Sequence, residues 1–224
     1  MTLLAFARGP ALDVSFAVLV LGIAWRLYAI FRRPVAADFS ASRSTALASG
    51  ALRAVVSRMW PQRTFRKRSL PATINAYGYH IGLAIVVFGF APHIGFVKRF
   101  TGLDWPPVPG WIFVASVAVV FVGMIYALVA RMNSPVLRQL STFDDYASWV
   151  VTMLPILTGM TLPTLPLDSP YPATPLYPVP VALHLLSVEL LLVWLPFSKL
   201  SHAFLVFASR AVTGAAFARR GAAF

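Results

Sequence analysis

Long apolar runs dominate this sequence and constrain its fold more than any other feature. A helix of about 20 apolar residues is long enough to cross roughly 30 Å of membrane hydrocarbon. The chain of 224 residues is 58% hydrophobic and 12% charged, which is the composition of a membrane protein and not of a soluble domain. We therefore predict an all-α integral membrane bundle of about five transmembrane helices, at residues 11–31, 72–97, 110–130, 146–163 and 179–208.

Positive charge between these runs sets the expected orientation. Lys and Arg residues are retained on the cytoplasmic side of a membrane, and nine of them lie in segment 32–70. The predicted opposite side has only Arg8, Lys98 and Arg99. We therefore expect the N-terminus outside and the C-terminus inside, in a multi-pass protein of the inner membrane of a prokaryote.

The runs and the segments between them divide the chain into four predicted parts. The first run is expected to be a retained helix, because Arg32 and Arg33 follow it, whereas a signal peptide carries its positive charge in front. The proline-rich stretch from Pro163 to Pro180 cannot form a regular helix and is expected to be an external connector. The four parts are a first transmembrane helix at 1–31, a basic cytoplasmic segment at 32–70, a four-helix part at 71–210 and a cytoplasmic tail at 211–224.

Composition also excludes several classes of function. The formal net charge is +12, but the basic residues lie between apolar runs and not on one polar face, so we expect no nucleic-acid binding. The chain has no cysteine, which excludes disulfides, covalent haem attachment, iron–sulfur ligation and thiol catalysis within it. Any such chemistry must belong to a partner.

An amphipathic pattern lies within the basic segment, at residues 46–60. An interfacial helix on membrane lipids is one interpretation, with Arg53 and Arg58 reaching water or lipid phosphate. A solvated loop retained on the cytoplasmic side explains the same charges without a partner. A docking surface for an acidic cytoplasmic subunit is the functional alternative. The apolar side of the pattern comprises Leu47, Leu52, Val55, Val56 and Met59.

All four histidines of the chain lie in or at the ends of the second and fifth predicted spans. A single histidine there would most simply be a hydrogen-bonded structural residue. Polar residues at membrane depth are costly, however, so four confined to two helices favour a functional role. Imidazole is a common axial ligand of haem iron. We therefore predict that the four histidines bind two b-type haems: His80, His93, His184 and His202.

Helical spacing predicts how these ligands pair. His184 and His202 are eighteen residues apart, which is five turns and about 27 Å along one face of a straight helix. His80 and His93 are thirteen apart, so their directions differ by roughly 140° unless Gly89 and Pro92 allow the helix to kink or unwind before His93. Antiparallel packing of the two helices pairs His80 with His202 at the inner haem iron, and His93 with His184 at the outer haem iron.

Three segments carry a resemblance to a known family. They are HLLSVELLLVWLPFSKLSHAF from His184, YHIGLAIVVFG from Tyr79 and STFDDYASWVVTMLPILTG from Ser141. They resemble the last, second and fourth helices of respiratory nitrate reductase gamma subunits, and the resemblance covers most of residues 70–210. It implies a five-helix cytochrome b with two haems b that oxidises membrane quinol. Electrons would pass to a cytoplasmic iron–sulfur or other redox subunit, so the chain would be an electron-transfer subunit and not the terminal catalytic one.

The chain departs from that family at one ligand. The second ligand on the second helix usually follows the first by ten residues, where this chain has Phe90. His93 is the available replacement at the outer haem. The alternatives are a protein with a single haem and an unrelated polar role for His93.

Glu189 is a further polar residue at predicted membrane depth. It points about 140° away from His184 around the helix, so we do not expect it to face a haem. A proton relay from quinol and a bond to a neighbouring helix are both open for it. The alternative function for the whole chain is a transporter or membrane scaffold without haem, in which the histidines serve proton movement or packing. Transport favours internal repeats, which the sequence does not clearly contain.

Overall fold

The computed structural model describes residues 1–32, 39, 41–162 and 178–222. Every regular element in those ranges is a helix, so the predicted all-α class is confirmed. Most of the proline-rich connector predicted between Pro163 and Pro180 lies outside the described residues. The helices form two compact units, one of Met1–Val18 with Ile74–Trp194 and one of Leu19–Thr73 with Leu195–Phe224.

Four helical segments in the described part of the chain are long and apolar enough to cross a membrane. Many of their large apolar side chains are exposed, as lipid-facing side chains would be; Leu21 and Trp25 are 69% and 64% exposed. The chain therefore has the helices of a multi-pass membrane protein. The four segments are Leu3–Phe31, Arg63–Gly89, Gly110–Asn133 and Lys199–Arg219.

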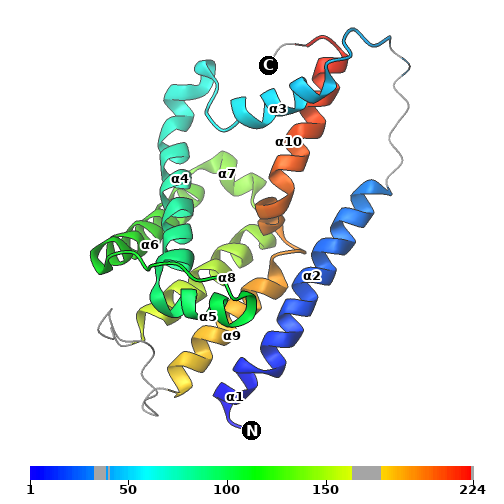
Figure 1. Ribbon diagram of the computed structural model, residues 1–224. Helices are drawn as coiled ribbons and strands as arrows, with labels where there is room; N and C mark the ends of the chain where they lie inside the picture. The colour runs from blue at the N-terminus through cyan, green and yellow to red at the C-terminus, as the bar shows by residue number, and fades with distance from the viewer. Residues whose placement is uncertain (33–38, 40, 163–177, 223–224) are drawn as a thin grey trace. The chain divides into compact units, whose positions relative to one another are not determined.

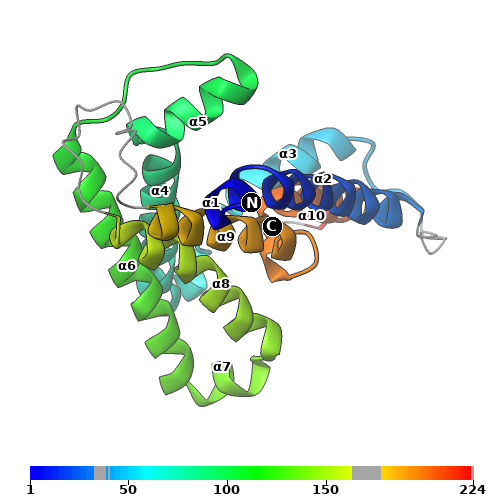
Figure 2. The same ribbon diagram turned by 90° about the horizontal axis from the view of Figure 1, so that it is seen from below.

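The first unit contains most of the helices. Its core lies where three of them, α4, α6 and α8, meet (Figure 1). A short helix, α7, joins α6 to α8 (Figure 2). The helices of this unit are α1 (Leu3–Arg8), the start of α2 (Pro10–Phe31), most of α4 (Arg66–Gly89), α5 (Ala91–Thr101), α6 (Gly110–Asn133), α7 (Pro135–Leu140), α8 (Phe143–Met160) and α9 (Pro178–Trp194).

Close packing of α4 and α8 on α6 builds the core of this unit. Val120 and Met124 of α6 are buried with Met153 of α8. Gly82 of α4 allows the approach, because a β-carbon there would lie 2.7 Å from Val120 Cγ2. The indole of Trp149 donates a hydrogen bond to the Met124 carbonyl at 2.8 Å, which ties α8 to α6.

Polar contacts pair α8 with α9 in antiparallel directions. Near the start of α8, Ser148 Oγ accepts from the indole of Trp194 at 2.9 Å, at the end of α9. Near the end of α8, Thr158 Oγ1 lies 2.9 Å from Ser187 Oγ. The early part of α9, which carries His184, therefore lies beside the end of α8.

Small residues pack the two main helices of the second unit, α3 and α10, against each other (Figure 1). Gly50 and Ala54 of α3 are buried where they meet Gly214 and Ala218 of α10. A β-carbon on Gly214 would collide with Ala54 Cβ and with the Gly50 carbonyl. The elements of this unit are the rest of α2, α3 (Leu47–Ser57), η1 (Arg63–Phe65), the start of α4, η2 (Lys199–Ser201) and α10 (His202–Arg219).

The second predicted span is two helices. α4 ends at Gly89 and α5 begins at Ala91, and Phe90 between them has φ −86° and ψ 126°. Pro92 lies in the first turn of α5, where its missing amide costs no hydrogen bond. The chain therefore unwinds at Phe90, which is one of the two alternatives predicted there, and the span over 72–97 is not one continuous helix.

The fifth predicted span is interrupted as well. α9 ends at Trp194, and α10 begins at His202 after a short 3-10 turn. Pro196 ends α9, because proline lacks an amide donor and its ring clashes with the carbonyl four residues earlier. The predicted continuous helix over 179–208 is therefore wrong. The prediction that His184 and His202 lie on one face of that helix is wrong with it.

Candidate functional site

Two of the four histidines meet in the first unit. The rings of His93, near the start of α5, and His184, in α9, have centroids 6.2 Å apart and planes 11° from parallel. Both residues are partly buried. The structure thus joins the two residues that the sequence paired as ligands of an outer haem iron.

The end of α4 determines the position of His93. The last carbonyls of a helix have no partner within that helix. Here the chain that follows supplies partners: the Val86 carbonyl accepts from His93 Nδ1 at 2.8 Å, and the Gly89 carbonyl accepts from the Val108 amide at 2.9 Å. The interruption after α4 therefore directs the His93 side chain back onto the helix end.

The end of α8 positions His184. The Thr158 hydroxyl donates to the Leu154 carbonyl at 2.8 Å, and we assign its oxygen as the acceptor from His184 Nδ1 at 3.2 Å. Ser187, nearly one turn after His184, donates to the His184 carbonyl at 2.7 Å and contacts the same threonine. Gly159 leaves room for the ring, because a β-carbon there would lie 3.2 Å from His184 Cε1.

These contacts also assign the protonated nitrogen of each ring. A backbone carbonyl only accepts hydrogen bonds, so His93 carries its proton on Nδ1. His80 and His202 make the same kind of contact, to the carbonyls of Ala76 at 2.7 Å and Lys199 at 2.8 Å. A neutral imidazole that is protonated on Nδ1 has its lone pair on Nε2, which is the form in which imidazole binds a metal.

The nearly parallel rings of His93 and His184 bring two imidazoles together. Imidazole nitrogen is a common ligand of haem iron. Within the described ranges, no group of three or more His, Asp or Glu side chains gathers as an ion site.

Phe90 stands where the resembled family has its ligand. Its ring stacks on Phe113 of α6 with centroids 4.2 Å apart and planes at 14°. It also meets His93 edge to face, at 5.2 Å and 84°. Phe90, the tenth residue after His80, therefore packs against the Phe113 ring and contacts the His93 ring.

The remaining two histidines belong to different units. His80 lies in the part of α4 within the first unit, and its ring stacks on Tyr79 with centroids 4.3 Å apart. His202 is the first residue of α10 in the second unit. Their pairing at an inner haem iron stays a prediction.

Glu189 is a second polar feature of α9. It is only 5% exposed, and neither carboxylate oxygen has a hydrogen-bond partner among the described residues. It follows the fully buried Ala182 by seven residues, so both lie on one helical face, which is not that of His184. A buried carboxyl without a partner is costly, which marks Glu189 as a functional candidate apart from the histidine pair.

Three residues around His184 were missed by sequence reasoning. Ser187 had a signal, because a spacing of three places its hydroxyl on the same helical face as His184. Thr158 and Gly159 come from another helix, so no spacing rule connects them to the histidine. Only knowledge of which helices pack together would have found them.

Comparisons with known proteins identify a similar protein, but its name states no activity. No protein-family model matches the chain, and no solved structure matches it. A protein of Nitratidesulfovibrio vulgaris is 26% identical over an alignment of 232 residues, which covers 98% of this chain and 96% of the relative. That relative is named only "Protein". The similarity therefore includes the basic segment as well as the helices, and the resemblance to gamma subunits stays a prediction based on motifs.

Proposed function

We propose that this chain is a membrane cytochrome b subunit that carries electrons between the quinone pool and a cytoplasmic redox partner through two haems b. One observation carries the proposal: the imidazoles of His93 and His184, which would hold a haem, meet with nearly parallel rings in a chain with helices long and apolar enough to span a membrane. The motifs that resemble nitrate reductase gamma subunits support the quinol part of the proposal.

His93 and His184 would hold the outer haem iron through Nε2. The Val86 carbonyl keeps the proton of His93 on Nδ1, and Thr158 does the same for His184. Such bonds fix ring orientation and make the imidazole a stronger electron donor to a metal. The haem supplies one-electron chemistry when bound, which no side chain of this cysteine-free protein provides.

His80 and His202 would hold the inner haem iron. Their Nδ1 protons are donated to backbone carbonyls, which supports ligation through Nε2. The proposal includes five membrane crossings, with α8 as the fourth and the interrupted segment 179–208 as the fifth. The N-terminus would lie outside and the C-terminus inside the inner membrane of a prokaryote, because segment 32–70 is strongly basic.

A basic cluster at the start of α4 supports a cytoplasmic partner. Its four members are exposed, and they offer a positive surface to an acidic subunit. Neutralising all four together is expected to weaken co-purification of the partner and to leave haem content unchanged. If the partner still co-purified as before, these residues would serve only to set the orientation of the chain in the membrane. The cluster comprises Arg63, Arg66, Lys67 and Arg68.

Anaerobic mixing of the purified protein with a reduced naphthoquinol tests the proposed function. The expected result is a b-type reduced-minus-oxidised spectrum that develops on addition of the quinol. Absence of haem absorption would contradict the proposal and favour a transporter or scaffold. If dithionite reduces the haem and the quinol does not, the protein is still a cytochrome, and its link to the quinone pool is contradicted.

A reporter fused after Phe224 is expected to be cytoplasmic.

A further inference from the structure

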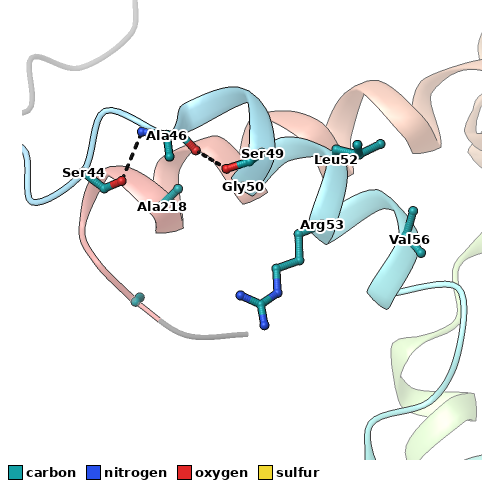
Figure 3. A pocket seen from close by; sticks show the side chains of 9 residues that line it. Ser44, Ala46, Ser49, Gly50, Leu52, Arg53, Val56 and Ala218 are labelled. Atoms are coloured by element: carbon teal, nitrogen blue, oxygen red, sulfur yellow. Dashed lines mark hydrogen bonds between the residues drawn. The ribbon is translucent and has the colours of Figure 1, made fainter.

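An open groove lies beside α3 and the end of α10 in the second unit. Its volume is ≈ 500 Å³, and it combines hydroxyl, apolar and basic side chains (Figure 3). Ser44 Oγ accepts from the Ala46 amide at 3.1 Å, so its hydroxyl proton is still available to a ligand. The side chains that matter here are Ser44, Ser49, Leu52, Arg53 and Val56.

Positive charge surrounds this groove. The guanidinium of Arg53 extends into the open space beside α3 (Figure 3), and it takes part in no ion pair among the described residues. The Arg43 amide donates to the Arg219 carbonyl at 2.8 Å, which brings two more arginines to the same end of α10. The second unit has fourteen Lys and Arg residues and a single acidic residue, Asp38, which lies outside the described ranges.

Exposed apolar side chains flank the same arginine. Leu52 and Val56 are 67% and 60% exposed, because α3 packs on α10 through Gly50 and Ala54 instead. The leucine and valine side of this amphipathic helix is therefore left exposed by the described residues of this unit. Apolar side chains beside a cation suit a lipid, whose acyl chains and phosphate satisfy both.

The position of α3 along the chain agrees with a lipid contact. It lies in the connection between two candidate spans, Leu3–Phe31 and Arg63–Gly89. It also packs on Gly214 and Ala218, near the end of a third candidate span, Lys199–Arg219. The end of a membrane-spanning helix is the level at which lipid headgroups lie.

We propose that the groove between α3 and α10 binds the headgroup of an anionic phospholipid. Arg53 contacts the phosphate, Ser44 donates a hydrogen bond to it, and Leu52 and Val56 contact the acyl chains. An acidic protein would satisfy the arginine and leave the two apolar side chains in water, so the lipid is the better occupant. The proposal is independent of the haems and requires only that the protein lies in a membrane.

Native mass spectrometry of the full chain in detergent tests this site. The protein is mixed with dioleoylphosphatidylglycerol or with dioleoylphosphatidylcholine at equal ratios, and the bound lipid is counted. The wild type is expected to retain phosphatidylglycerol preferentially. Arg53→Gln is expected to weaken the tightest phosphatidylglycerol adduct about fivefold, and Arg53→Lys is expected to restore part of the binding. Arg138→Gln, the same charge change at an exposed residue outside the groove, is the matched control and should bind as the wild type does.

Four results would overturn the lipid site. Equal binding by Arg53→Gln and wild type would remove Arg53 from it. Equal losses in Arg53→Gln and Arg138→Gln would show a diffuse charge effect without a groove. Displacement of the lipid by inorganic phosphate at millimolar concentration would make the groove a site for the free anion. Loss of an acidic protein from the Arg53→Gln purification, with lipid binding intact, would make it a protein docking site instead.

Discussion

The rings of His93 and His184 stand 6.2 Å apart and 11° from parallel. This relationship depends on the interruption at Phe90, because an ideal continuous helix would turn His93 roughly 140° away from the direction of His80. With the helix broken, His93 bonds back to the Val86 carbonyl and faces α9. The interruption therefore assembles a candidate ligand pair that a straight helix would separate.

The hydrogen bond from His184 to Thr158 gives the first prediction. Thr158→Val removes the side-chain hydrogen-bond partner that we assign to His184 Nδ1 and keeps the shape of the side chain. The imidazole then donates less electron density, so the midpoint potential of the outer haem is expected to rise, and haem retention is expected to weaken about tenfold. Potentiometric titration of the purified protein measures the first effect and haem loss in detergent the second.

Thr152→Val is the matched control for that change. Thr152 is on the same helix and donates to the Ser148 carbonyl at 2.8 Å, as Thr158 donates to Leu154. Its replacement removes a comparable hydroxyl away from His184. Equal potentials in the two variants would mean that Thr158 has no influence through the histidine.

Space beside His184 gives the second prediction. A β-carbon at Gly159 would already lie 3.2 Å from the His184 ring, so Gly159→Val is expected to displace the ring and lower haem content toward one per chain. Gly95→Val in α5 is the control, because a β-carbon there meets nothing within 4 Å. Haem quantitation against protein compares them. Full haem content in Gly159→Val would show that the ring needs no such clearance.

Packing of α3 on α10 gives the third prediction. Gly214→Val forces a side chain into Ala54 and the Gly50 carbonyl, and overpacking of this kind costs about 1–3 kcal/mol. Faster hydrogen exchange in α3 is the expected result. Val212→Ala, at a position that is 71% exposed on the same helix, should leave the exchange unchanged. Slow hydrogen exchange of the α3 amides in both variants would contradict the packing of α3 on α10 at Gly214.

An exposed ion pair after α5 gives a prediction about pH. The hydrogen bond from Lys98 Nζ to Asp104 Oδ2, 2.6 Å long, lowers the pKa of the Asp104 carboxyl. A lowered pKa in the folded state means that the stabilisation is present above the unfolded pKa and is lost as pH falls through the folded pKa. The effect is small because both groups face solvent. Lys98→Gln should return this pKa toward its ordinary value in a carbon NMR titration, and an unchanged pKa would exclude the pair in solution.

Hydropathy and helix-breaking chemistry explain how much of the fold the sequence predicts. Apolar composition is sufficient for the all-α membrane class, since only helices and closed barrels satisfy backbone groups in lipid. The interruption at Pro196 was also readable, because a proline within a helix removes a hydrogen bond. The eighteen-residue spacing of His184 and His202 suggested one continuous face and obscured that proline. The rule that proline ends a helix was therefore correct here, and the inference from the histidine spacing was wrong.

The surroundings of the ligand pair were beyond sequence reasoning for a different reason. Thr158 and Gly159 act on His184 only because α8 and α9 pack antiparallel, which depends on contacts spread over both helices. The role of the Val86 carbonyl depends on α4 ending at Gly89 rather than one turn later. The local sequence pattern identifies the histidines, whereas the groups that orient them are brought close only by tertiary packing.

Haem quantitation in three variants tests the ligand pair most directly. The proposal gives two haems per chain in the wild type and one in His93→Ala and in His184→Ala, because either change leaves the same iron with one protein ligand. The double variant should also retain one haem. A double variant with no haem, beside single variants with one each, would show that the two histidines serve different sites. Two haems in either single variant would contradict ligation by that histidine.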